Sequence, residues 1–400
     1  MEEIKDTAWK RCRKVMSPWF TNAYFKNMAP SVDSSLVTMF GLLDKVVQTG
    51  QSANMIDMYA NFMIDLIAGQ VYGVSLDSTA QPDHPFVTNL YGIIDSKWYR
   101  VLAIRLLPKF LLNLFDIRTP FSESAHQYFF QLCRHRIEEV RRNGGRDSQQ
   151  RTDFIGLFAR MLVNTEDDGN DQNRQLREQQ WEQSGMPKYL YENEMLANAW
   201  FFTLGGFEGI QILLAFATYE LALDPDLQNR VYLELQKAVD TDSQRVDTKL
   251  LADLPLLNGV VCETLRLHAL VASEGRVAEE DYVLGGGGGD TGICIEKGTK
   301  VMFPFYAIHK SPDNYPEPWL FRPDRWLPEN RDQLIPNTFM PFGVGPRHCI
   351  AERFALLEAK YVLTQLLRRY RVCRSPDTLV GRSTEIYLGR NMFLKWEKRN

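Results

Sequence analysis

The chain has 400 residues, of which 44% are apolar and 24% are charged, and its formal net charge at pH 7 is −4. This composition is typical of a globular protein with a large core, and the slightly acidic balance argues against a nucleic-acid partner. The six cysteines include no Cys-x-x-Cys pair, which favours reduced thiols over a disulfide framework. The sequence predicts neither a transmembrane helix nor a signal peptide.

Residues 1–16 predict a basic helix. Lys10, Arg11 and Lys14 lie close together in it, and a charge run of this kind usually marks a solvated helix face. Trp9 and Arg13 are four residues apart and therefore share one face of the helix.

Between residues 30 and 160, helical periodicity predominates. Residues 34–47, 55–67 and 122–142 carry apolar side chains at helical spacing. The polar stretch 165–185 predicts an exposed connector, not a domain boundary.

The longest helical pattern runs from Asn193 to Leu223. Its apolar or small residues recur at spacings of three and four: Met195, Ala199, Phe202, Gly206, Gly209, Leu213 and Phe216. The segment is apolar nearly all round, which predicts a helix buried in the middle of the protein. Because glycines lower helix stability, we expect either a flat ligand or a closely packed helix against Gly206 and Gly209.

The part of the chain after this helix mixes one further helix with short strands. The helix is predicted over residues 256–269, with Glu263 and Arg266 on one face. Strands are expected at residues 281–284, 293–295, 300–308, 370–373 and 386–396. The glycine run 285–289 is not followed by Gly-Lys-Ser/Thr, so it predicts a flexible hairpin loop and not a phosphate-binding loop.

The stretch 341–354 is a glycine-punctuated loop that ends in one cysteine, Cys349, just before a predicted helix. Helix N-termini favour a thiolate over a thiol. Gly343 and Gly345 let a flat ligand approach the backbone, and Arg347 is a cation suited to a carboxylate. Together these features suggest a haem whose iron is held by cysteine. The alternative is an ordinary buried thiol before an amphipathic helix.

The loop motif resembles the haem-binding loop of the cytochromes P-450. The residues that carry the resemblance are Phe342, Gly343, Gly345, Arg347, Cys349 and Ala351. The amino-acid sequences of this loop and of residues 219–228 are similar to those of one animal clan of the family. This clan contains the family-three drug-metabolising enzymes, insect detoxification enzymes and thromboxane synthase. The resemblance implies a single domain over residues 1–400, mainly α with small β-sheets. It also implies that the family's N-terminal anchor, first helices and some sheet strands are missing here.

The resemblance also implies roles for individual residues. Cys349 would ligate the iron of heme b (iron protoporphyrin IX), with Phe342 and Gly343 beside it. The haem propionates would be held by Trp9, Arg13, Arg276 and Arg347. Glu263, Arg266 and Arg325 would form a buried structural triad. Residues 87–115 would roof the substrate pocket, or else form plain helix–helix core, and the turn at 384–387 would reach into the pocket.

The central helix departs from the family pattern at its oxygen-binding groove. Gly206 and Glu208 match that pattern, but Gly209 stands where the family has a threonine that helps to deliver protons to the reacting oxygen. Glu208 would then serve proton delivery with water in place of the alcohol.

The function implied by the resemblance is oxidation of a lipophilic small molecule, such as a xenobiotic, steroid or fatty acid, by a haem-thiolate monooxygenase. Electrons would come from NADPH-cytochrome P-450 reductase, docked at a basic proximal face that includes Lys10, Arg11 and Lys14. The location implied is the cytosolic face of the endoplasmic reticulum membrane, although no anchor is expected in this chain. Two alternatives remain: a peroxide isomerase of the thromboxane-synthase type, because of Gly209, and an inactive truncated fragment.

Overall fold

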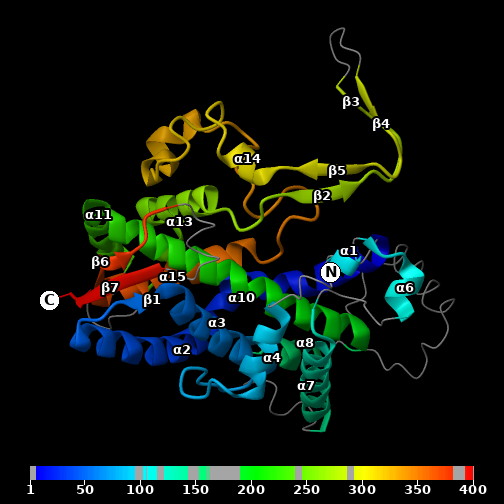
Figure 1. The fold of residues 1–400 in the computed structure, drawn as a ribbon, viewed down its shortest axis with the longest axis horizontal. Helices are drawn as coiled ribbons and strands as arrows, with labels where there is room; N and C mark the ends of the chain where they lie inside the picture. The colour runs from blue at the N-terminus through cyan, green and yellow to red at the C-terminus, as the bar shows by residue number, and fades with distance from the viewer. Residues whose placement is uncertain are drawn as a thin grey trace. The chain divides into compact units, whose positions relative to one another are not determined.

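The structure is a computed structural model (Figure 1). It describes residues 6–94, 102–104, 106–114, 121–142, 153–159, 162, 190–238, 246–285, 292–381 and 392–399. The predicted connector 165–185, part of the predicted pocket roof (residues 95–101, 105 and 115), the glycines at 286–289 and the turn at 384–387 lie outside the described residues.

The chain divides into two compact units, each described here by itself. The first unit comprises Met1–Ala215 and Arg353–Asn400, and the second comprises Phe216–Glu352. Most described residues are helical, and the described strands form small antiparallel sheets. This confirms the predicted fold class, mainly α with small β-sheets. One domain over residues 1–400 stays a prediction.

The first unit is built mainly from helices. They are α1 (Asp6–Met16), η1 (Ser17–Phe20), α2 (Asn22–Thr49), α3 (Met55–Tyr72), α4 (Pro85–Ile94), α6 (Lys109–Leu114), α7 (Glu123–Arg142), α8 (Phe154–Phe158), most of α10 (Glu192–Leu223) and most of α15 (Glu352–Arg369). Helix α2 is longer than the predicted 34–47 because the side chain of Thr21 caps it and it runs through Pro30.

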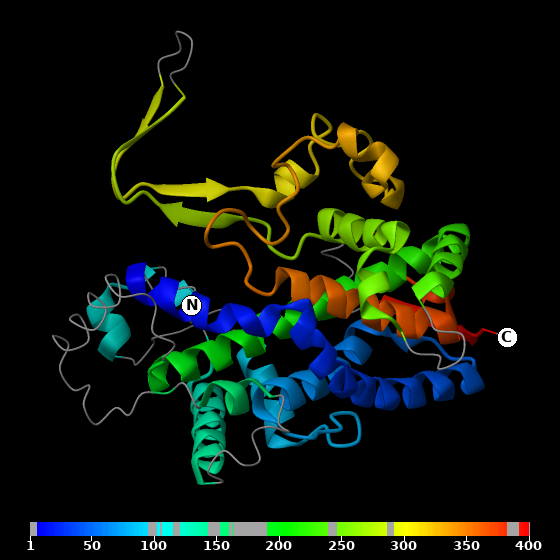
Figure 2. The ribbon, with the colours of Figure 1, turned by 180° about the vertical axis from the view of Figure 1, so that it is seen from behind.

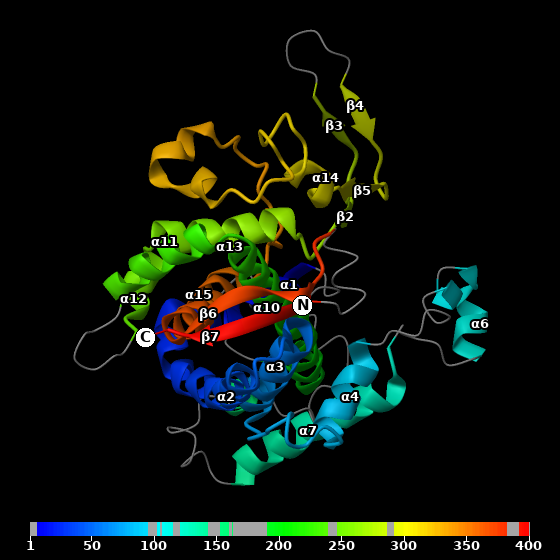
Figure 3. The ribbon, with the colours of Figure 1, turned by 60° about the vertical axis from the view of Figure 1, so that its left-hand side comes forward.

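The sheet of the first unit has the strand order β1-β7-β6, and Figure 3 shows β6 and β7 side by side. Its strands are β1 (Ala53–Asn54), β6 (Tyr370–Thr378) and β7 (Met392–Lys398), and β6 pairs with β7 from Tyr370↔Lys398 onward. Side chains alternate between core and surface, so that Tyr370, Val372 and Trp396 are buried. The sheet lies beside α2 and α3, and the Trp396 indole N–H approaches Met55 Sδ at 3.3 Å.

The second unit begins with the end of α10. Its elements are α11 (Pro225–Leu235), η5 (Gln236–Ala238), α12 (Thr248–Ala252), α13 (Pro255–Leu267), β2 (Glu274–Val277), β3 (Tyr282–Leu284), β4 (Ile293–Ile295), β5 (Lys300–Phe303), α14 (Phe305–His309), η6 (Pro323–Trp326) and η7 (Pro328–Gln333). Strands β2 and β5 form one two-stranded ribbon, and β3 and β4 form another (Figure 2). Helix α13 packs closely on η6, since a Cβ on Gly259 would lie 2.5 Å from the Pro323 carbonyl oxygen.

The prediction of one strand over residues 300–308 is wrong. Strand β5 ends at Phe303, and α14 occupies Phe305–His309. Pro304 separates the two elements, because proline has no N–H to donate to a sheet and is well tolerated at the start of a helix. Strand β2 was not predicted at all.

The central helix α10 confirms the longest predicted element. It spans Glu192–Leu223, within one residue of the predicted start. By length and hydropathy it also qualifies as a membrane span, but 61% of its apolar window is buried inside the molecule, as in a core helix.

Glu358 is a carboxyl group buried in the core of the first unit. It lies on α15, and its Oε1 accepts a hydrogen bond of 3.3 Å from Gln70 Nε2 of α3. Burial raises the pKa of Glu358 from 4.5 to about 7, and the bond from Gln70 only partly offsets this.

We expect the free energy of unfolding of the protein to fall as pH rises from about 4.5 to about 7, because the native state binds a proton at Glu358 that the unfolded state has lost. The full effect is roughly 3 kcal/mol. The free energy of unfolding of Glu358→Gln, measured with urea, should not show this fall. The stability of the variant relative to the natural protein should therefore increase as pH rises. The exposed Glu138→Gln variant of α7 serves as control; a parallel pH profile for Glu358→Gln and the natural protein would contradict the expectation.

Candidate functional site

The cysteine loop belongs to the second unit. Cys349 is half-buried, and α15 begins three residues later at Glu352, as predicted. The Cys349 N–H donates to the Phe342 carbonyl oxygen at 2.8 Å and so closes the loop. Inside the loop, Gly343 has φ +73° and Gly345 has φ +77°, backbone conformations that favour glycine.

A buried histidine supports the entry to this loop. His309 of α14 accepts the Met340 N–H at its Nε2 atom, 2.9 Å away, and Met340 in turn accepts the Gly343 N–H. Burial, with Arg266 and Lys310 nearby, lowers the pKa of His309 to about 4, so the ring is neutral at pH 7. A neutral ring can accept the hydrogen bond that positions the loop.

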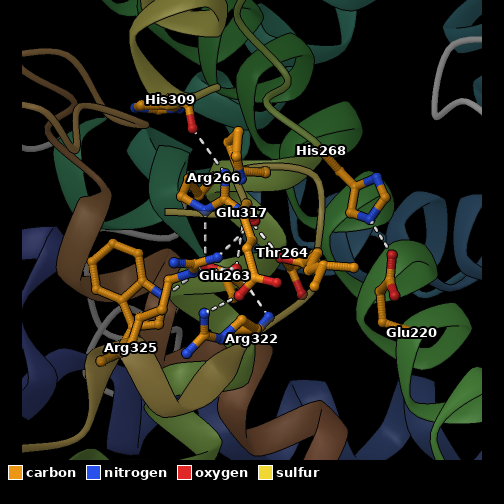
Figure 4. Close-up of polar contacts among 12 residues, drawn as sticks. Glu220, Glu263, Thr264, Arg266, His268, His309, Glu317, Arg322 and Arg325 are labelled. Carbon is orange, nitrogen blue, oxygen red and sulfur yellow. Dashed lines mark hydrogen bonds and ion pairs between the residues drawn. The ribbon is translucent and has the colours of Figure 1, made fainter. Parts of the chain in front are cut away.

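His309 is connected to the buried carboxylate of Glu263 (Figure 4). The His309 carbonyl oxygen accepts a hydrogen bond of 2.8 Å from Arg266 Nη1, and the other guanidinium nitrogens of Arg266 bind Glu263. Arg325 Nε lies 3.1 Å from Glu263 Oε1, which completes the triad expected from the resemblance. Glu263 and Arg266 are fully buried, so this pair is not the exposed and weak pair that helical spacing alone would give.

Arg276, a predicted propionate ligand, lies on β2 and forms an ion pair with Glu274. The distance from Arg276 Nη1 to Glu274 Oε1 is 2.6 Å, and both side chains are about one-third exposed. The other oxygen of Glu274 faces the cysteine loop, because it would lie 3.0 Å from a Cβ built on Gly343. The structure thus brings Arg276 and Gly343 together through Glu274.

The residues of this unit fit a cysteine-ligated haem by the chemistry of their donors. Cys349 offers a half-buried thiol just before a helix, and Gly343 and Gly345 have no side chain that would keep a flat ligand from their backbone. Arg347 is half-buried between Gly345 and Cys349, and Arg276 is the second guanidinium suited to carboxylates.

Trp9 and Arg13 share one face of α1, as predicted. The Arg13 guanidinium carbon lies 5.9 Å from the centroid of the Trp9 ring, and both side chains are half-buried. Both residues belong to the first unit.

The prediction that Arg11 points outward is wrong. Arg11 is fully buried, and its Nη2 lies 2.6 Å from Glu194 Oε1 of α10. Glu194 also accepts the Tyr191 N–H, so the carboxylate is well satisfied. Lys10 and Lys14 are exposed. Of the three residues in the predicted basic face, Lys10, Arg11 and Lys14, these two lysines therefore lie at the surface.

The three positions predicted to form the oxygen-binding groove, Gly206, Glu208 and Gly209, lie on the first-unit part of α10 and are half-buried. A Cβ on Gly206 would meet only Ile67 Cδ1, at 3.8 Å, among the described atoms within 4 Å. Close helix packing therefore does not explain this glycine. Burial raises the pKa of Glu208, which favours its protonated form.

The structure thus places five of the predicted site residues in each unit. Phe342, Gly343, Arg347, Cys349 and Arg276 are in the second, and Trp9, Arg13, Gly206, Glu208 and Gly209 are in the first. Sequence reasoning missed Glu274 and gave His309 no role. The alternation of Glu274 and Arg276 was the available signal for an ion pair, because residues two apart on a strand share a face.

Comparisons with known proteins agree with the resemblance. A family model described as cytochrome P450 matches residues 4–385. Cytochrome P450 3A25 of Mus musculus is 30% identical over 386 residues, which cover 94% of this chain and 70% of the mouse protein. Cytochrome P450 3A13 of the same species is 31% identical, covering 92% of this chain and 69% of its own length. Lithocholate 6-beta-hydroxylase of Mesocricetus auratus is 31% identical, covering 96% and 72%.

We expect Gly343→Ala to destabilise the protein slightly more than Gly345→Ala does. Both substitutions place a Cβ on a backbone with positive φ, at a cost of about 1–2 kcal/mol. Only the Cβ at position 343 would also meet a side chain, Glu274, at 3.0 Å, whereas the one at 345 meets nothing described within 4 Å. Urea unfolding of the two variants measures the difference. Equal destabilisation would show that Glu274 does not press on the loop.

Proposed function

Because the chain belongs to the cytochrome P450 family of enzymes, which hold a cysteine-ligated haem and include many monooxygenases, we propose that Cys349 is the iron ligand of this enzyme. The observation that carries the proposal is the closed loop between Phe342 and Cys349, with its two glycines at positive φ. When bound, the haem supplies the redox chemistry that activates dioxygen.

Two of the other cysteines fit this role poorly. Burial raises the pKa of Cys12 and of Cys133 to about 12, which keeps both as neutral thiols at pH 7. Cys262 is buried within α13, and Cys294 is exposed on β4. Cys349 combines partial burial with a position just before a helix.

We assign the propionate contacts to Trp9, Arg13, Arg276 and Arg347. A guanidinium group is always charged and binds a carboxylate through two parallel hydrogen bonds. The indole N–H of Trp9 adds a neutral donor on the same helix face as Arg13. In this assignment the four side chains orient the cofactor and do not react.

Glu208 is proposed to hold and pass on a proton. Its burial favours the protonated carboxyl, which is the form that can donate. Gly209 has no hydroxyl group, so a water molecule is proposed to stand in for the side chain that family members have there. Gly206 leaves room beside these groups, since a Cβ there would meet Ile67 alone among the described atoms within 4 Å.

The proposed substrate is a lipophilic small molecule such as a xenobiotic, a steroid or a fatty acid. The name of one relative, lithocholate 6-beta-hydroxylase, supports a steroid-like substrate. The proposed electron donor is NADPH-cytochrome P-450 reductase, with Lys10 and Lys14 offering exposed positive charge. The proposed location is the cytosolic face of the endoplasmic reticulum membrane.

We expect the protein loaded with haem to give a Soret band at the thiolate position in its reduced carbon monoxide difference spectrum. Cys349→Ser should abolish this band because a hydroxyl group is a poor substitute for the thiolate ligand. Cys294→Ser, at an exposed position, should keep it. Far-UV circular dichroism separates loss of the ligand from loss of folding. A thiolate band in folded Cys349→Ser would contradict the assignment.

Gly209 favours a second candidate function, a haem-thiolate peroxide isomerase. Rearrangement of a peroxide needs no external electrons and no protons delivered for the cleavage of dioxygen. An enzyme of this kind would not require the alcohol that Gly209 lacks. The leading proposal remains the monooxygenase.

Turnover of a fatty-acid endoperoxide without NADPH and reductase separates the two candidates. The monooxygenase should leave the endoperoxide unchanged and consume NADPH with its own substrate. Gly209→Thr should then raise the ratio of product formed to NADPH consumed, because a hydroxyl group completes the proton path. Rapid isomerisation in the absence of reductase would contradict the leading proposal and support the second.

A further inference from the structure

Glu274 is the one acidic side chain described in contact with both a predicted propionate ligand and the cysteine loop. Its Oε1 lies 2.6 Å from Arg276 Nη1, and its Oε2 is directed at Gly343. Arg276 Nη1 also donates to the Gly275 carbonyl oxygen at 3.0 Å. Nη1 therefore has an ion-pair partner and a hydrogen-bond acceptor, both within strand β2.

The arrangement leaves Arg276 unable to bind a further carboxylate through both terminal nitrogens. A bidentate, end-on contact needs Nη1 and Nη2 together. Nη1 is occupied by Glu274, so a second carboxylate would have to displace Glu274 or bind in a less favourable geometry.

The Arg276–Glu274 pair is weak enough to be exchanged. Both side chains are about one-third exposed, and ion pairs of this kind contribute only about 0–1 kcal/mol. The pair differs in this respect from Glu263–Arg266, which is fully buried. Its geometry therefore suits a temporary partner.

We propose that Glu274 is a placeholder carboxylate, which pairs with Arg276 and gives it up to a propionate when haem binds. This inference rests on the proposed role of Arg276 as a propionate ligand. Glu274 is a positioning residue that keeps the guanidinium group extended along β2, and it lowers the affinity for haem as a consequence. Gln at position 274 keeps the shape of the side chain against Gly343 but carries no charge.

The test is a titration of the haem-free full-length chain with haemin, followed by quenching of tryptophan fluorescence. Glu274→Gln should bind haemin more tightly, by up to about fivefold, the factor that corresponds to ~1 kcal/mol. The gain should shrink at high ionic strength. Glu280→Gln, an exposed residue on the segment after β2, is the matched control and should change the affinity little.

A double-mutant cycle with Arg276→Ala distinguishes this inference from the role of Arg276 itself. Arg276→Ala alone should weaken haemin binding, and in its background Glu274→Gln should have no effect beyond that of the control. Unchanged or weaker binding by Glu274→Gln, while Arg276→Ala still weakens binding, would overturn the placeholder and leave the propionate contact standing. Unchanged affinity in Arg276→Ala would instead overturn the assignment of Arg276, and the placeholder with it.

Discussion

The carboxylate of Glu263 is fully buried, and the second unit is arranged around the need to satisfy it. It accepts hydrogen bonds from Arg266, from Arg325, from the indole of Trp326 and from the Arg322 N–H (Figure 4). Removing one partner of a buried ion pair costs about 3–5 kcal/mol, because the remaining charge is left uncompensated. Through Arg266 and the carbonyl oxygen of His309, the same network extends to the residues that enter the cysteine loop.

Much of the fold could be predicted because its signals are local. The periodicity of α10, the glycines at 343 and 345 and the position of Cys349 before α15 are all visible in short windows of sequence. Each of these features depends on the types of a few neighbouring residues: apolar residues at helical spacing form a buried helix, and glycine tolerates a positive φ.

The rest depended on partners that are distant in the sequence. Arg11 has the helical spacing of a solvated basic face, yet Glu194 lies 183 residues away and draws its side chain into the core. Glu274 and Gly343 are likewise brought together only by the fold. Spacing also gave no measure of burial for Glu263 and Arg266, and burial is what makes that pair important. Charge patterns alone therefore misjudge side chains that find a distant counter-ion.

Helix α10 passes from one compact unit into the other without a break, since the boundary falls between Ala215 and Phe216. Each helical hydrogen bond joins residues four apart, so the bonds that span this boundary belong to both units at once. Helix formation is cooperative, and fraying at one end of a segment destabilises the turns next to it. The two units therefore do not have independent folding equilibria: amide hydrogens in the middle of α10 should exchange with solvent only in openings that involve both.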